Sequence, residues 1–284
     1  MSVGIGLGSR ARAPVAVPVV AALLAAALAT WIVTIERMRG MDAGPGTDLG
    51  ALGWFLGVWV TMMAAMMFPS VAPMVVAVAR VSGHRAPGAS GGVGPTMAFV
   101  AGYLAVWTAY GLVAYGVVRV LAVAEPGFLA WERQGPLIAG AAVAAAGAYQ
   151  LTPMKRACLS HCRSPLGFVM HRWRRGWAGA LMMGLEHGAW CLGCCVGLML
   201  VLLVLGVMSI TWMAVVAAVV FAEKVLPIGI LVSRGIALGL VGLGIWIAVA
   251  PAGVPALTEP GVTMPMDQPA PADGMARPMP MAAP

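Results

Sequence analysis

The sequence predicts an all-α protein, a bundle of about seven helices that each cross a lipid bilayer. Of its 284 residues, 61% are hydrophobic and 10% are charged, and the mean hydropathy is +0.92. Apolar runs of about 20 residues, the length that crosses a bilayer core, recur along the chain. Basic residues gather in alternate connections between these runs. This composition excludes a soluble globular domain and a disordered chain.

The apolar runs define the helices in chain order. We place them near residues 14–34, 51–79, 96–123, 136–152, 178–207, 211–232 and 235–254. The fourth run is short, and only Ser233 and Arg234 separate the last two, so six spans are the alternative to seven. The helical domain then covers residues 13–254, between an N-terminal segment of residues 1–12 and a tail of residues 255–284.

The first run has two interpretations. Arg10 and Arg12, followed by apolar residues and by "ALA" at Ala27 to Ala29, match a cleaved signal peptide. The apolar residues continue beyond that cleavage site through Trp31 and Val33, which favours a retained helix.

Charge predicts the orientation. With the N-terminus inside, the outer connections contain five basic and eight acidic residues, whereas the cytosolic connections contain eleven basic residues and no acidic residue. The cytosolic set is Arg10, Arg12, Arg80, Arg85, Lys155, Arg156, Arg163, Arg172, Arg174, Arg175 and Arg234. The positive-inside rule therefore places the N-terminus in the cytosol and the tail outside, in a plasma (inner) membrane protein. The net charge of +7 reflects topology and contact with anionic lipid heads, and indicates no nucleic-acid partner.

The stretch "LEHGAWCLGCC", Leu185 to Cys195, places polar and sulfur groups inside a strongly apolar helix. At about 100° per residue, one face carries four candidate ligands, with Cys195 one position further round. These four are Met183, His187, Cys191 and Cys194. Thiolate, thioether and imidazole groups suit soft or borderline ions, so the stripe predicts a site for Cu(I), Zn(II) or an iron–sulfur centre. The alternative is that each thiol is a small buried apolar side chain.

Two further segments offer matching ligands. "TMMAAMMFPS" aligns Met62 and Met66 on one face, before prolines that are expected to kink the helix. "CLSHC" places Cys158, His161 and Cys162 on one face of a cytosolic helix. The alternatives are core packing for the methionines and a pair of reduced interfacial thiols for the cysteines.

Charged residues inside the predicted spans are few. They include Glu186, Glu223 and Lys224, and each would cost about 2.5–3.5 kcal/mol if ionised in the bilayer. Such groups face a bundle interior or a wet cavity. Glu223 is expected to neutralise a cation, relay a proton or form an ion pair between helices, and Lys224 is expected to pair with Glu186.

The C-terminal tail combines methionine with proline. It contains Met264, Met266, Met275, Met279 and Met281, with too little apolar periodicity to fold. Thioethers bind Cu(I) in an oxidising compartment, so the tail is either a weak external copper collector or plain disordered sequence.

Five ordered blocks carry a family resemblance. They are "MMAAMMFPS", "YQLTPMKRACLSHCRSP", "HGAWCLGCCVGLML", "GVMSITWM" and "AEKVLP". Together they resemble a bacterial family of unknown function, described as predicted metal-binding integral membrane proteins, over about residues 50–232. Val196 and Met154 depart from residues common in the family, but neither is a proposed ligand. The resemblance implies metal binding and no particular reaction.

We therefore expect a membrane protein that handles a soft metal, with Cu(I) favoured over Zn(II), as a transporter or metallochaperone with a protein metal donor or acceptor. The alternatives are an accessory subunit of a membrane complex and a thiol-disulfide oxidoreductase. No nucleotide-binding loop is found, so any transport is expected to be driven by a gradient or by a partner. No catalytic residue is proposed, and a non-enzymatic role is favoured. The sequence leaves the oligomeric state open.

Overall fold

The computed structural model describes residues 15–39, 49–85, 92–124, 133–207, 209–226, 229–254 and 257, and no strand occurs in these ranges. The helices are α1 (Ala16–Met38), α2 (Leu52–Arg85), α3 (Val93–Ala124), α4 (Gly135–Tyr149), α5 (Pro153–Arg163), α6 (Pro165–Arg172), α7 (Gly176–Leu205), α8 (Ile210–Val225) and α9 (Gly229–Val249). A 3₁₀ turn, Pro251–Gly253, follows α9. The all-α prediction is confirmed for the described residues.

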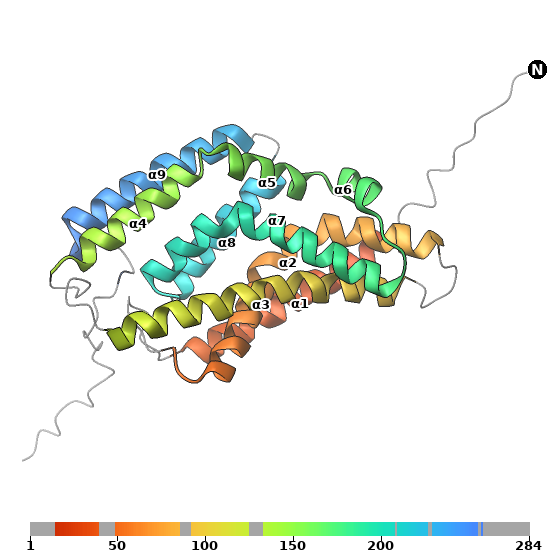
Figure 1. Ribbon diagram of the computed structural model, residues 1–284, viewed down its shortest axis with the longest axis horizontal. Coiled ribbons are helices and arrows are strands. Elements are labelled where there is room, and N and C mark those ends of the chain that lie inside the picture. The colour runs from red at the N-terminus through yellow and green to blue at the C-terminus, as the bar shows by residue number, and fades with distance from the viewer. Residues whose placement is uncertain are drawn as a thin grey trace, which may run out of the picture.

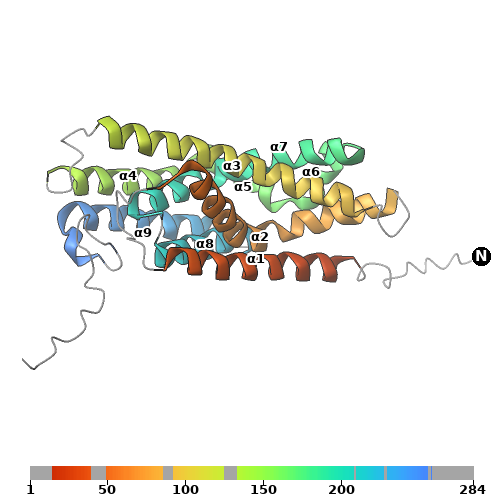
Figure 2. The same ribbon diagram turned by 90° about the horizontal axis from the view of Figure 1, so that it is seen from below.

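The long helices lie along the long axis of the molecule (Figure 1). The colours show the chain direction of each helix. Helices α1, α3 and α7 run in one direction, and α2 and α4 run in the opposite direction (Figures 1 and 2). The main helix pairs are α1 with α2, α3 with α7 and α4 with α9. Because α3 and α7 are parallel neighbours, residues of the fifth predicted span lie directly against the third.

Five helices, α1, α2, α3, α7 and α9, are long and apolar enough to cross a membrane. Helices α4 and α5 meet at a bend of 63°, and they add a sixth span if the two helices together are counted as one. Helix α8, which overlaps the predicted run 211–232, has 16 residues, fewer than the roughly 20 that a bilayer core requires. The count of seven and the orientation stay predictions. The N-terminal residues 1–12 and the methionines of the tail lie outside the described residues.

Helix α2 is the central element of the core. In its most apolar stretch 83% of the residues are buried, against 11% in α1 and 17% in α9. A helix that is apolar all round belongs in an interior, and α2 has this pattern. Pro69 and Pro73 lie within it, and the helix changes direction along its length (Figure 2), as expected for proline. Its methionines therefore face protein.

Small residues fix the register between α3 and α7. A Cβ atom at Gly102 would collide with the carbonyl of Leu181, and one at Gly184 would collide with the carbonyl of Phe99. Such close approach of two backbones is a common way for apolar helices to pack. It places the middle of α7 opposite the aromatic side chains of α3.

The start of α5 is encoded locally. The hydroxyl of Thr152 accepts a hydrogen bond from the backbone N–H of Lys155 at 3.3 Å, and Pro153 occupies the first turn. This is the usual chemistry of a helix N-terminus. Because α4 has just ended at Tyr149, the new helix leaves at 63° and packs against α7 and α8. The bend brings "CLSHC" to the sulfur-bearing face of α7.

Candidate metal centre

Helix α7 presents a buried row of candidate ligands. His187, Cys191, Cys194 and Cys195 are each no more than 2% exposed. Cys191 and Cys194 lie one turn apart, and the thiol of Cys194 donates to the backbone carbonyl of Cys191 at 3.1 Å. The sulfur atoms of Cys194 and Cys195 are 3.4 Å apart. The predicted stripe is therefore an interior surface of the protein.

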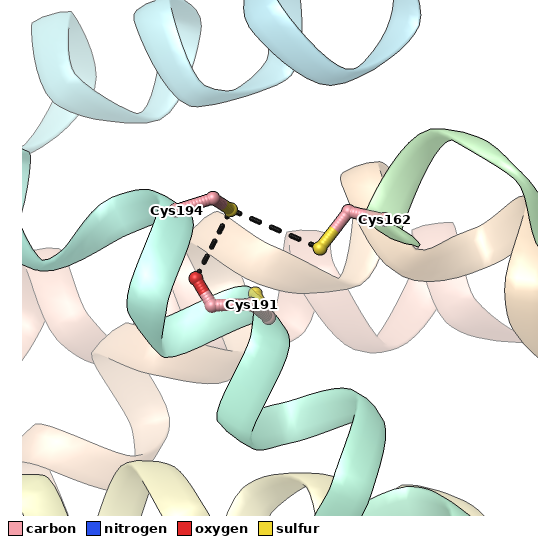
Figure 3. Close-up of side chains that lie close together, drawn as sticks. All are labelled: Cys162, Cys191 and Cys194. Carbon is pink, nitrogen blue, oxygen red and sulfur yellow. Dashed lines mark hydrogen bonds between the residues drawn. The ribbon is translucent and has the colours of Figure 1, made fainter. Parts of the chain in front are cut away.

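Helix α5 brings a further thiol, that of Cys162, to this row. The sulfur of Cys162 lies 3.8 Å from that of Cys194 (Figure 3), and the two side chains point toward each other. The sulfur atoms of Cys162, Cys191 and Cys194 all lie within 4.8 Å of one another. Sulfur binds zinc at about 2.3 Å, and three sulfurs in a plane around an ion at that distance are about 4 Å apart. A small contraction of this group, called here the thiol triad, would hold one ion.

Two polar side chains lie against Cys191. The ammonium group of Lys224 on α8 donates to its sulfur at 3.0 Å, and the hydroxyl of Tyr103 on α3 lies 3.1 Å from the same atom. An adjacent cation favours the thiolate, which is the form that binds metals. The thiol triad therefore lies in an electropositive part of an otherwise apolar core.

The central helix α2 also reaches Lys224. The sulfur of Met67 lies 3.9 Å from the Lys224 ammonium, and the hydroxyl of Ser70 lies 3.4 Å from it. Met62 and Met66, the predicted ligands, are buried in the same core as the triad. Their role as ligands stays a prediction, because the described contacts connect Met67 to the site.

His187 lies one turn before Cys191. Its ring packs among Phe99, Tyr103 and Phe168, with centroid distances of 5.3–5.9 Å. Its Nδ1 atom is buried without a hydrogen-bond partner among the described residues. The ligand group within 4.8 Å does not include His187 or Cys195, so their coordination stays a prediction.

The other predicted ligands face elsewhere. The sulfur of Met183 accepts from the backbone N–H of Arg174 at 3.3 Å, about 12 Å along the helix axis from Cys191. His161 stacks on Trp190 at 4.2 Å, with its Nδ1 atom 2.9 Å from the carbonyl oxygen of Ala157. The sulfur of Cys158 packs against Gly193. Of the three predicted ligands in "CLSHC", Cys162 belongs to the triad, and Cys158 and His161 do not.

Glu186 and Lys224 have partners other than each other. Glu186 binds Arg172 at 3.0 Å, so the predicted pairing of Lys224 with Glu186 is wrong. The reason is geometric, because Glu186 faces the α6 side of α7 while Lys224 reaches Cys191.

The carboxylate of Glu223 binds Lys155 at 2.7 Å, and both residues are almost fully buried. Lys155 also donates to Gln150. Lys155 was expected in a cytosolic connection, and that side of the membrane stays a prediction. The structure adds that its side chain is buried in the protein. The alternative of an interhelical ion pair for Glu223 is the one observed.

Sequence reasoning missed Tyr103, Lys155, Met67 and Ser70 as neighbours of the site. Met67 belongs to the quoted methionine cluster, but the pattern favoured the line through Met62 and Met66. Nothing local distinguishes Tyr103 or Lys155, because their partners lie 88 and 68 residues away in the chain.

A comparison with protein families agrees with this chemistry. The model of the family described as "PpoB2: Copper chaperone" matches residues 56–247, which is more than half of the chain. The chain belongs to the PpoB2 copper chaperone family. The match contains the whole thiol triad, Lys224 and the pair Lys155–Glu223. No curated protein and no solved structure matches the chain.

Membership of the copper chaperone family narrows the interpretation of the triad. The sequence predicted a soft-metal site, and the family relates the chain to copper. The three cysteines that approach one another are among the predicted ligands, and they provide soft donors.

Proposed function

We propose that the protein is a membrane-embedded copper chaperone that holds Cu(I) between Cys162, Cys191 and Cys194 and transfers it to a protein partner. The observation that carries the proposal is the approach of three thiols from two helices to within 4.8 Å. Five long apolar helices support the membrane location.

The donor set favours Cu(I) over Zn(II). Zinc in structural sites takes four ligands in a tetrahedron, and a catalytic zinc adds a water to three protein ligands. In the described structure the close group has three members, all thiols, without the imidazole of His187. Three soft sulfur donors are sufficient for Cu(I). Lys224 offsets part of the negative charge that three thiolates around Cu(I) would carry.

The arrangement also suits transfer rather than permanent storage. Cys191 and Cys194 are buried, whereas Cys162 is partly exposed near the end of α5. A partner thiol that displaces Cys162 first would gain the ion by ligand exchange. The predicted orientation puts this end of the site on the cytosolic side.

The test is metal loading of the full chain in detergent, with reductant present. We expect one Cu(I) per chain, and serine variants of Cys162, Cys191 or Cys194 should lose at least about tenfold in affinity against a competing Cu(I) chelator. Cys158→Ser is the matched control, because Cys158 lies on α5 outside the triad. Equal losses in all four variants, or no copper in the unaltered protein, would contradict the proposal.

One observation favours a second candidate. The 3.8 Å between the sulfur atoms of Cys162 and Cys194 on separate helices is short enough for a disulfide to form after a small movement. A thiol-disulfide oxidoreductase would use this pair. The role of an accessory subunit stays a prediction from the sequence.

A further inference from the structure

A cationic cavity lies at the corner between α4 and α5, where the start of α9 approaches. It has a volume of about 620 Å³, and its lining includes Arg156, Arg163, Arg234, Gln150 and Ser233. The described residues that line it include no acidic side chain. Three arginines from two helices therefore line one space that has no acidic residue in its described lining.

Gln150 gives an independent indication of a ligand. Its side chain is 2% exposed, and its Oε1 atom accepts from Lys155. Its Nε2 atom is buried without a hydrogen-bond partner in the described structure. A buried donor without an acceptor costs about 1–3 kcal/mol. Gln150 also lines the cavity, so a rotation of its side chain would present this donor to an acceptor oxygen of a ligand.

The arginines that line the cavity have N–H groups that are free to bind a ligand. Arg163 donates to the carbonyl of Leu226, which uses one of the five N–H groups of its guanidinium. Arg156 and Arg234 are exposed and form no ion pair within the described ranges. Guanidinium groups bind phosphate oxygens in pairs, which makes arginine the usual side chain for phosphate recognition.

We infer that this cavity is a binding site for a phosphate group, held by Arg156, Arg163 and Arg234 with the Nε2 of Gln150 as an additional donor. Two sources offer this chemistry, the phosphodiester of an anionic phospholipid and free phosphate. Leu151 and Leu159 also line the cavity, so an acyl chain would meet apolar surface beside the arginines. All three arginines belong to the predicted cytosolic set, where anionic headgroups attract basic residues.

The site is separate from the thiol triad, so the inference does not depend on copper binding. Thermal unfolding in detergent reports whether a variant is folded. The test compares Arg156→Gln/Arg234→Gln with Arg174→Gln/Arg175→Gln. The second pair removes the same charge from exposed arginines of the predicted cytosolic set that do not line the cavity.

Binding is measured on the full chain in detergent with two probes. Phosphatidylglycerol is followed by native mass spectrometry, and inorganic phosphate by titration calorimetry. We expect the cavity variant to bind phosphatidylglycerol at least about tenfold more weakly than the unaltered and control proteins. The same pattern with inorganic phosphate alone would support the site and identify free phosphate as the source. Binding that is equal in both variants, or absent for both probes, would overturn the inference. If the double variant has no cooperative unfolding transition, Arg234→Gln alone replaces it.

Discussion

The ammonium group of Lys224 lies 3.0 Å from the sulfur of Cys191, while the neighbouring Glu223 binds Lys155 on another helix. Two adjacent residues of α8 thus connect to α7 and to α5, the two helices that supply the thiol triad. The position of Cys162 relative to Cys191 depends on both connections. Copper affinity should therefore respond to residues that are not ligands.

Lys224→Met is expected to lower Cu(I) affinity by at least about tenfold, because it removes the cation that offsets the thiolate charge. Lys224→Arg keeps the charge and should retain most of the affinity. Competition with a Cu(I) chelator measures both. If Lys224→Met binds copper as tightly as the unaltered protein, the ammonium group has no role in the site.

Removing only one charge of the pair Lys155–Glu223 is expected to destabilise the protein, because the other charge then stays buried without a counter-ion. Glu223→Gln leaves a buried ammonium without its counter-ion, at a cost of about 3–5 kcal/mol. Lys155→Met/Glu223→Leu removes both charges and should be less destabilising than Glu223→Gln. Thermal unfolding in detergent gives the order of the midpoints. A double variant with the lowest midpoint would show that the pair is itself strongly stabilising.

Much of this arrangement was predictable from local pattern. The helical class, the interior stripe of α7 and the interior location of Glu223 follow from hydropathy and periodicity. Which residues complete the site does not, because contacts between distant segments decide it. Cys162 joins the triad only because α5 turns by 63° at Thr152, and Lys155 is buried only because Glu223 lies opposite. The sequence places Lys155 in a cytosolic connection, and no local signal predicts that its side chain is buried.

Thiol labelling should separate metal binding from redox chemistry. In copper-loaded protein with reductant present, alkylation of the triad should be slow, and a Cu(I) chelator should accelerate it, since a bound ion holds the thiolates. A redox site would respond to reductant and ignore the chelator. Cys158 is the internal reference, because it lies outside the triad. Labelling that follows reductant alone would favour the thiol-disulfide candidate.

The last prediction concerns Gly193, which lies between Cys191 and Cys194 in the sequence. A Cβ atom at this position would lie 2.7 Å from the sulfur of Cys158 and 3.6 Å from its Cβ atom. Gly193→Ala should therefore push α5 away from α7 and move Cys162 away from the other two thiols. Overpacking of this kind costs about 1–3 kcal/mol, and copper affinity should fall with it.

Cys158→Ala removes the obstructing sulfur and leaves an ordinary 3.6 Å contact. We expect Cys158→Ala alone to load copper normally and Gly193→Ala/Cys158→Ala to recover most of the affinity that Gly193→Ala loses. Chelator competition on the four proteins forms a double-mutant cycle. Recovery would show that the spacing of α5 and α7 controls the site. If the double variant binds Cu(I) as weakly as Gly193→Ala, the loss of affinity has a cause other than contact with Cys158. The prediction that the triad depends on the spacing of α5 and α7 would then be wrong.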